Sequence, residues 1–429
     1  MTTDTSPYAG AEAGLPAGAA PEATARESAA PATAGDLLAL VRSGRAHTRS
    51  DLRRLTGLSR TAVVSRVNAL TRTGLLLVGE ELASTGGRPP GALVLNRDAG
   101  VVLAVAVGRS RSQIAVFDLG GAELAADSRD HAVGVGPEEL MPAIAERAGQ
   151  LLSGRTAPVL GTGLSLPGTV DTVRGASLDS PVMRGWDGVE LAPYFSSLAE
   201  APLFVGNDVD VMARAELLAR GVGRPDGLLD ALVVKASTGL GLGIVADGRV
   251  VTGHLGAAGE IGHTWVPAAD GLACRCGRTG CLEAVAGGWA LVARLAQEQP
   301  EGPDGGSGHA VGHVRDLVAL AQRGDARARV LLRESGRQLG ELLAVAVNLL
   351  NPATVVLGGD MAAAFDVFAA GVRERLYARA SALATRDLRL VPATHGDRAG
   401  LVGCAALALD HVLAPAVVDA RLSAATMPA

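Results

Sequence analysis

Aromatic side chains, lysine and cysteine are all scarce in this chain of 429 residues. Aromatic residues make up 3% of the sequence and hydrophobic residues 48%, so aliphatic side chains must fill the core. Lys235 is the only lysine, and arginine supplies the rest of the Lys and Arg charge. The sequence also has no apolar run long enough to cross a membrane and no secretory signal, so we expect a cytoplasmic protein without a membrane partner.

The length and the charge distribution suggest separate modules. A chain of this length exceeds a single hydrophobic core, which predicts two or three domains. Residues 1–34 are mostly Ala, Pro, Gly, Thr and Glu, and we expect a disordered tail because they cannot bury a core. The net charge is −5, yet residues 36–90 hold nine arginines against four acidic residues. This basic segment indicates a nucleic-acid-binding module, and a solvated arginine-rich face is the alternative.

Residues 35–96 have the pattern of a winged helix-turn-helix domain, with three helices followed by two short strands. Thr48–Asp51 has the form of a capping box that begins the second helix, in which we expect Leu52 and Leu55 to face inward. Ser59 is placed to cap the third helix. The apolar residues of this third helix recur at the spacing of one buried face, at Val63, Val67 and Leu70.

The start of the third helix and the wing are the predicted DNA contacts. The third helix would enter the major groove, where Arg60 is suited to a bidentate pair with guanine. Arg88 lies in a wing at 84–90, between strands expected over 75–78 and 92–95, and would enter a minor groove or bind phosphate. The predicted DNA-binding residues are Arg60, Thr61, Ser65 and Arg88. A small three-helix domain that contacts another protein is the alternative.

From residue 97 onward, apolar strands alternate with helical segments, which indicates α/β layers. The expected strands cover 101–107, 113–118, 159–166, 203–205 and 354–357, with a strand, glycine turn and strand over 232–245. The expected helices cover 137–152, a segment from about 209, 325–349 and, as the last helix, 401–413.

Three of the four cysteines lie within eight residues, at Cys274, Cys276 and Cys281, and His263 stands eleven positions before the first of them. Glycines within the loop allow the backbone to turn tightly. One histidine and three cysteines would make a closed structural zinc site. Ordinary buried cysteines or a disulfide are the alternatives, although three cysteines cannot pair completely.

The pattern from Glu260 to Glu283, E-x-G-H followed by C-x-C-G-x-x-G-C-x-E, resembles the signature of the ROK family. That family holds sugar kinases and sugar-responsive transcription repressors, and the resemblance covers roughly residues 36–415. It implies an actin-like, ribonuclease-H-like fold of two α/β lobes that close on a cleft. The implied boundaries are a small lobe at 97–209, completed by a C-terminal helix at about 400–415, and a large lobe at 210–399 with a zinc loop at 263–283.

The same resemblance implies a sugar site. The family's sugar-binding motifs fall on Asn207, Asp208, Glu260, His263 and Glu283. Such side chains suit a sugar because carboxylates accept from hydroxyl groups, whereas an amide or imidazole both donates and accepts. His263 would bind zinc through one ring nitrogen and the sugar through the other.

The phosphate-binding motifs depart from those of the family's kinases. Asp208 would be the general base of a kinase, but phosphoryl transfer also needs a phosphate cradle and magnesium. Where the family's first cradle reads D-x-G-G-T, Ala106 removes the carboxylate and Arg109 replaces a glycine. The second cradle, Ser237–Gly241, is mostly intact. We therefore expect no catalysis and no ATP or Mg²⁺, with structural Zn²⁺ as the cofactor.

The sequence thus predicts a sugar-responsive transcription regulator, acting as a repressor of carbohydrate uptake or metabolism genes. Its expected partners are operator DNA and a sugar or sugar derivative. Two half-sites need two DNA-binding heads, so we expect a homodimer or homotetramer. The alternative is an ATP-dependent sugar kinase with a fused DNA-binding domain and Asp208 as its base. A third reading is a regulator that binds ATP without transferring phosphate.

Overall fold

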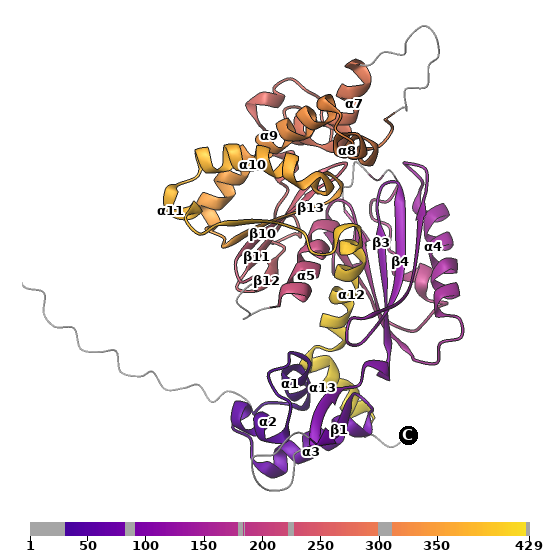
Figure 1. The fold of residues 1–429 in the computed structure, drawn as a ribbon. Helices are drawn as coiled ribbons and strands as arrows, with labels where there is room; N and C mark the ends of the chain where they lie inside the picture. The colour runs from indigo at the N-terminus through magenta and orange to yellow at the C-terminus, as the bar shows by residue number, and fades with distance from the viewer. Residues whose placement is uncertain are drawn as a thin grey trace, which may run out of the picture.

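The computed structural model describes residues 31–81, 91–178, 183, 185–221, 227–298 and 311–425. Figure 1 shows a group of N-terminal helices at one end of the molecule, next to two larger α/β layers. The predicted wing, including Arg88, lies outside the described residues. So does the tail at 1–30.

The N-terminal helices begin where the sequence supplies caps. Thr33 and Thr48 each make a capping box, with Asp36 and Asp51 respectively, and Ser59 accepts a hydrogen bond from the backbone three residues on. These caps satisfy N–H groups that a helix start leaves unpaired. The elements of this head are α1 (Ala34–Arg42), α2 (Arg49–Thr56), α3 (Arg60–Arg72), β1 (Leu76–Glu81) and β2 (Gly91–Leu95).

The buried face of α3 agrees with the prediction, whereas one residue of α2 does not. Val63, Val67 and Leu70 are fully buried. Leu52 is also buried, but Leu55 is 36% exposed, so its predicted inward position was wrong. Leu52 is the one buried residue of the eight-residue α2. The helix ends at Gly57, where the backbone has a φ of 70° and the chain changes direction.

The first five-stranded sheet has the strand order β5-β4-β3-β6-β9. Strands β3, β6 and β9 run parallel, whereas β3, β4 and β5 form an antiparallel meander. The α4 helix covers one face and packs Leu140, Met141 and Ile144 against the sheet. The bounds are β3 (Val101–Val107), β4 (Arg111–Asp118), β5 (Glu123–Asp130), α4 (Pro137–Leu152), β6 (Val159–Leu166), β7 (Val170–Asp171), β8 (Ala176–Ser177) and β9 (Leu203–Asn207).

The second five-stranded sheet has the order β12-β11-β10-β13-β14, with β10, β13 and β14 parallel. Helices α7 to α10 pack against its outer face in one apolar cluster. Its strands are β10 (Ala231–Ala236), β11 (Leu240–Ala246), β12 (Arg249–Val251), β13 (Thr354–Gly358) and β14 (Arg389–Pro392). Its helices are α6 (Glu283–Ala286), α7 (Gly288–Glu298), α8 (Val314–Gln322), α9 (Ala326–Leu350), α10 (Phe365–Arg379) and α11 (Ala382–Thr385).

Helices α5 (Asp208–Arg220) and α12 (Ala399–Val412) lie between the two sheets. They approach so closely that a Cβ built on Gly403 would stand 1.9 Å from the carbonyl oxygen of Val211. Short 3₁₀ helices complete the description: η1 (Arg97–Ala99), η2 (Ala192–Phe195), η3 (Ile261–His263), η4 (Pro267–Ala269), η5 (Asp360–Ala364) and η6 (Gly396–Arg398).

Helix α12 is not the last helix, contrary to the prediction, because α13 (Pro415–Ala424) follows it. Proline at its first position suits a helix start, and only two residues separate the helices. In Figure 1, α12 descends from the sheets and α13 lies beside α1. A Cβ on Gly35 would stand 2.2 Å from the carbonyl oxygen of Pro415, and the Gly35 N–H donates to Asp419 at 2.9 Å. The C-terminus thereby holds the N-terminal head.

Among the described helices, none has by itself both the length and the hydropathy to cross a membrane. The segments Gly396–Val412 and Pro415–Ala424 reach that threshold only as a pair, and they are bent by 54°. Most of α12 is buried in the core of this fold.

Candidate functional site

A cleft of about 640 Å³ lies between the two sheets. The end of β3 and its turn form one wall, whereas the β10–β11 turn and the segments that follow β13 and β14 form the other. The start of α5 and the helix η3 also line it. This volume falls within the range of about 300–1,000 Å³ that is typical of small-molecule sites.

All five residues predicted to bind sugar line this cleft: Asn207, Asp208, Glu260, His263 and Glu283. They come from the start of α5, from η3 and from the start of α6. The fold therefore brings together residues from three separate stretches of sequence.

Asn207 and Glu283 are engaged with the protein itself. The side-chain oxygen of Asn207 caps α5, and its amide nitrogen donates to the carbonyl of Gly168 at 2.6 Å. Glu283 accepts from the Leu240 N–H and from the indole N–H of Trp289, both at 3.0 Å. These hydrogen bonds hold Gly168, Leu240 and Trp289 in place, so both residues also support the walls of the cleft.

Asp208 forms an ion pair with Lys235, the single lysine of the chain. Lys235 stands out in the sequence as the single lysine, but no role was predicted for it. A charged residue inside the apolar strand β10 is the signal that could have found it, because such a charge needs a partner. Lys235 therefore contacts the carboxylate that would act as the general base in a kinase.

Two carboxyl groups near Asp208 are difficult to ionise. Burial raises the pKa of Asp210 to about 7, and the charge of Asp208 adds to this effect although Arg214 opposes it. The Oδ1 atom of Asp210 is buried without a hydrogen-bond partner among the described residues. Burial also raises the pKa of Glu260. Asp210 was not among the predicted site residues.

The predicted metal ligands form a compact cluster. The donor atoms of His263, Cys274, Cys276 and Cys281 all lie within 4.8 Å of one another. The sulfur atoms of Cys276 and Cys281 are 3.7 Å apart, and Cys274 Sγ is 3.8 Å from His263 Nδ1. Ligands about 2.3 Å from a tetrahedral zinc would be separated by about 3.8 Å, so this donor set fits Zn²⁺. Among the described residues, no disulfide joins these cysteines.

The turn after β3 carries the two departures from the kinase pattern. Both Ala106 and Arg109 line the cleft. The Nε atom of Arg109 is buried without a hydrogen-bond partner among the described residues. Burial lowers the pKa of Arg109, whereas the charge of Glu283 raises it.

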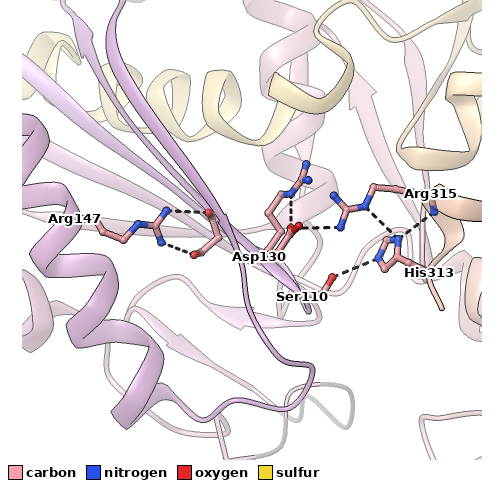
Figure 2. A network of polar contacts seen from close by, with 7 residues as sticks. Ser110, Asp130, Arg147, His313 and Arg315 are labelled. Carbon is pink, nitrogen blue, oxygen red and sulfur yellow. Dashed lines mark hydrogen bonds and ion pairs between the residues drawn. The ribbon is translucent and has the colours of Figure 1, made fainter.

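A polar network connects the two lobes at the cleft (Figure 2). Arg315 donates from Nε to His313 Nδ1 at 3.2 Å and from Nη2 to Asp130 at 3.4 Å. Arg111 donates to the same Asp130 oxygen at 2.8 Å. The hydroxyl of Ser110 lies 3.4 Å from His313 Nε2. The network thus ties the β4–β5 hairpin to the start of α8.

Arg147 supports this hairpin from α4, on the other face of the sheet (Figure 2). Its buried guanidinium forms an ion pair with Asp127 and donates to the hydroxyl of Ser112 at 2.8 Å. The hairpin that carries Arg111 is therefore held on both sides.

The predicted DNA-binding residues of α3 lie on its exposed surface. Arg60, Thr61 and Ser65 are all exposed near the start of that helix, on the side opposite its buried face. Neither Arg88 nor the rest of the predicted wing is within the described residues.

A model of the ROK family matches residues 102–411, which covers most of the chain. A xylose repressor from Caldicellulosiruptor bescii is 25% identical over 375 residues, covering 85% of this chain and 92% of the repressor. A glucokinase from Halalkalibacterium halodurans is 32% identical over 269 residues, covering 61% of this chain and 80% of the enzyme.

The same relationship appears among solved structures. The crystal structure of a ROK family transcriptional regulator, a homologue of the Escherichia coli MLC protein, superposes with a TM-score of 0.73. The sequence identity is 26%, and the match covers 91% of this chain and 98% of that one. The likeness therefore includes the N-terminal head as well as the two sheets.

Proposed function

Because the chain belongs to the ROK family, we propose that it is a sugar-responsive transcription regulator whose head binds operator DNA and whose cleft binds a sugar. The main support for this proposal is how much of the chain is similar to transcriptional regulators. A transcriptional regulator of known structure matches 91% of the chain, including the head, whereas the glucokinase alignment spans 61%. The repressor relative likewise aligns over 85% of the chain.

The head suits a winged helix-turn-helix. Its second and third helices are joined by the short turn at Gly57, and α3 leaves Arg60, Thr61 and Ser65 exposed. Side chains at the start of such a helix reach base edges in the major groove. Two heads would read two half-sites, so we propose a homodimer or homotetramer acting as a repressor in the cytoplasm.

The cleft suits a polyhydroxylated ligand. Carboxylate, amide and imidazole groups converge there, and each can bind hydroxyl groups. In this proposal Glu260 and His263 contact the sugar, and Asn207 and Glu283 hold the walls around it. Zinc bound by His263 and the three cysteines would fix the loop that carries these residues, which links metal binding to folding.

A physical route connects the cleft to the head. Helix α5 begins with Asp208 in the cleft, and Arg214 on the same helix forms an ion pair with Asp410 of α12. Asp410 also pairs with Arg42 of the head. A sugar that binds one arrangement of α5 better than another would shift the placement of the head.

The kinase alternative has less support in the cleft. Asp208 is present, but Lys235 occupies its carboxylate and Ala106 supplies no carboxylate to organise magnesium. Phosphoryl transfer depends mainly on positioning and neutralising the phosphates, which a general base alone does not achieve. We therefore propose a sensor without catalysis.

The test begins by selecting an operator from a random duplex library with the purified full chain. Gel shifts on that operator are then repeated with a panel of pentoses, hexoses and amino sugars. At least one sugar should change operator affinity, with a coupling of roughly 1–3 kcal/mol. Glu260→Gln should weaken that response, whereas the matched change Glu374→Gln on the exposed surface of α10 should preserve it. Failure to enrich any DNA sequence would refute the proposal.

A further inference from the structure

A polar bridge crosses the cleft between the two sheets (Figure 2). Ser110, in the turn after β3, and Asp130, at the end of β5, belong to the first sheet. His313 caps α8 and Arg315 lies in its first turn, and α8 packs against the second sheet. The Ser110 hydroxyl lies 3.4 Å from His313 Nε2, and Arg315 Nη2 donates to Asp130 at 3.4 Å. Because Ser110, His313 and Arg315 also line the cleft, the bridge borders the space for a ligand.

This bridge is weaker than the joint that α5 and α12 make between the same sheets. That joint is a close backbone approach, since a Cβ on Gly403 would stand 1.9 Å from the Val211 carbonyl oxygen. The bridge consists of polar side chains near solvent, and those of Arg315 and Asp130 are 32% and 63% exposed. Solvent screens such an ion pair, so it can break without unfolding the elements that carry it. A relative movement of the two sheets would therefore break the bridge before the joint.

The neighbours of His313 fix the protonation state of its ring. The Nδ1 atom accepts the backbone N–H of Arg315 at 3.1 Å and the Nε–H of the same residue at 3.2 Å. A ring nitrogen that accepts hydrogen bonds carries no proton, so the hydrogen of the neutral ring is on Nε2, which donates to Ser110. Histidine is also an unusual helix cap, because Ser, Thr, Asp and Asn are favoured at that position. One ring thus joins the cap of α8, the Arg315 guanidinium and the first sheet.

Protonation of His313 is incompatible with this arrangement. A proton on Nδ1 would face both N–H groups of Arg315, so either the ring or the guanidinium must move away. The protonated ring could still donate from Nε2 to Ser110, but the same guanidinium also holds Asp130. Uptake of one proton therefore breaks at least one of the two contacts across the cleft.

The charged groups around His313 come from both sides of the cleft. They are Arg315 and Asp316 of α8, Asp360 of η5, Asp130 of β5 and, through Asp130, Arg111 of β4. Burial lowers the pKa of His313 most and the charge of Arg315 lowers it further, whereas the three carboxylates raise it. The net result is a pKa below the ordinary 6.5. Because the bridged form holds its proton less readily than an opened form, the bridge is stable above about pH 6.5 and weakens progressively below it.

We propose that Ser110, Asp130, His313 and Arg315 form a pH-sensitive latch, which holds the two sheets together across the cleft and opens when His313 takes up a proton. This inference goes beyond the proposed function, because it concerns the closure of the cleft and requires no particular ligand. Protonation of a histidine at an interface is a general means of switching between two arrangements. A ligand that needs the closed cleft would bind more weakly at acid pH.

Double electron–electron resonance on the zinc-containing full chain tests the latch. Nitroxide labels on non-natural residues at two exposed positions, Glu139 of α4 and Arg329 of α9, report on the two sheets and leave the cysteines untouched. The wild-type distances should be short at pH 8 and shift to longer values at pH 5. His313→Asn should give the longer distances at both pH values, because asparagine caps a helix but does not titrate and is too short to reach Ser110.

His254→Asn is the matched control, because His254 is exposed after β12 and lies outside the cleft lining, and it should keep the wild-type response. Ser110→Ala should lengthen the distances at pH 8 while His313 is intact. Zinc content and circular dichroism show whether each protein is folded at each pH. Equal distances in wild type and His313→Asn at pH 8, a comparison that needs no acid, would overturn the proposal. So would a pH-dependent shift of the same size in His313→Asn.

Ring ¹⁵N spectra give a second measurement. The signals of His313, identified by their loss in His313→Asn, should show the Nε2–H tautomer at pH 8, and the Nδ1–H tautomer would contradict the latch. Neither measurement involves DNA or sugar. A failed latch would therefore leave the sugar-responsive regulator standing, and a chain that binds no operator could still have the latch.

Discussion

Asp410 of α12 accepts a hydrogen bond from Arg42 of the head at 3.0 Å, although the two residues are 368 positions apart in the sequence. The other oxygen of the same carboxylate lies 3.8 Å from Arg214 of α5. One side chain therefore contacts both the head and the helix that begins in the cleft. Its carboxylate therefore links these two parts through one polar side chain.

We predict that Asp410→Asn uncouples the sugar response from DNA binding. The side chain of Asp410 is 49% exposed, so solvent screens the pair and its loss should cost less than about 1 kcal/mol of stability. Operator affinity without sugar should stay near the wild-type value, while the shift on adding sugar becomes smaller. Gel shifts with and without sugar measure both.

The control for this variant is Glu374→Gln, which also removes a partly exposed carboxylate shared by two arginines, here Arg333 and Arg337. It lies on α10, away from the head, and should leave the response unchanged. A full sugar response in Asp410→Asn would show that coupling runs by another route.

Loss of one zinc ligand should lower metal content and stability together. Cys276→Ser removes a thiolate from the four-residue cluster, and the loop between His263 and Glu283 then loses its cross-link. Elemental analysis of wild type should give about one zinc per chain, and the variant should give clearly less with a lower melting temperature. Cys404→Ala is the control, because that buried thiol lies outside the cluster and its loss should leave zinc content intact. A wild type purified without chelators that holds no zinc would contradict the assignment.

DNA readout should depend on the start of α3. Arg60→Ala should cost about 1–3 kcal/mol of operator affinity and relax the preference at one base position, because a bidentate contact to guanine is lost. Competition gel shifts with single-base operator variants measure this change. Arg72→Ala, at the opposite end of the same helix, should weaken binding uniformly or not at all. Equal loss of base preference in both variants would place the readout elsewhere.

Asp210 should make stability depend on pH. Burial raises the pKa of Asp210 to about 7 from 3.8, so the folded state holds a proton that the unfolded state has already lost. This group therefore lowers stability as pH rises above its unfolded pKa, and the loss levels off above its folded pKa. Asp210→Asn removes the effect, so its stability advantage over wild type should grow from about pH 5 to about pH 7, reaching a few kcal/mol. Urea denaturation of both proteins across this range measures it, and a constant difference would contradict the raised pKa.

Sugar kinase activity should be absent. Incubation with ATP, magnesium and the sugar panel in a coupled ADP-release assay should give no turnover above background. Lys235 holds Asp208, and Ala106 cannot organise magnesium, so the phosphates are neither positioned nor neutralised for transfer. Turnover of about 1–100 per second that disappears in Asp208→Asn would establish the kinase instead.

Local features of this protein could be predicted from sequence because their causes lie within a few residues. Thr48 and Ser59 cap their helices through bonds to backbone groups three positions away. The cysteines from 274 to 281 cluster because the chain between them is too short to separate them. The bounds of α4 and β6 likewise follow from periodicity and turns, and they agree with the prediction. Leu55 was the exception, since its burial depends on what covers a short helix.

The relationships between distant elements were decided by the tertiary structure alone. Lys235 meets Asp208 because β10 runs beside the start of α5, and no spacing in the sequence encodes that distance. Asp410 meets Arg42 because α13, a helix that was not predicted, turns back and docks α12 against the head. The sequence by itself determined the caps, the His and Cys residues of the candidate metal cluster, and the family. Which charges are paired depended on how the two sheets pack around α5 and α12, because an ion pair forms only where packing brings its partners within a few ångströms.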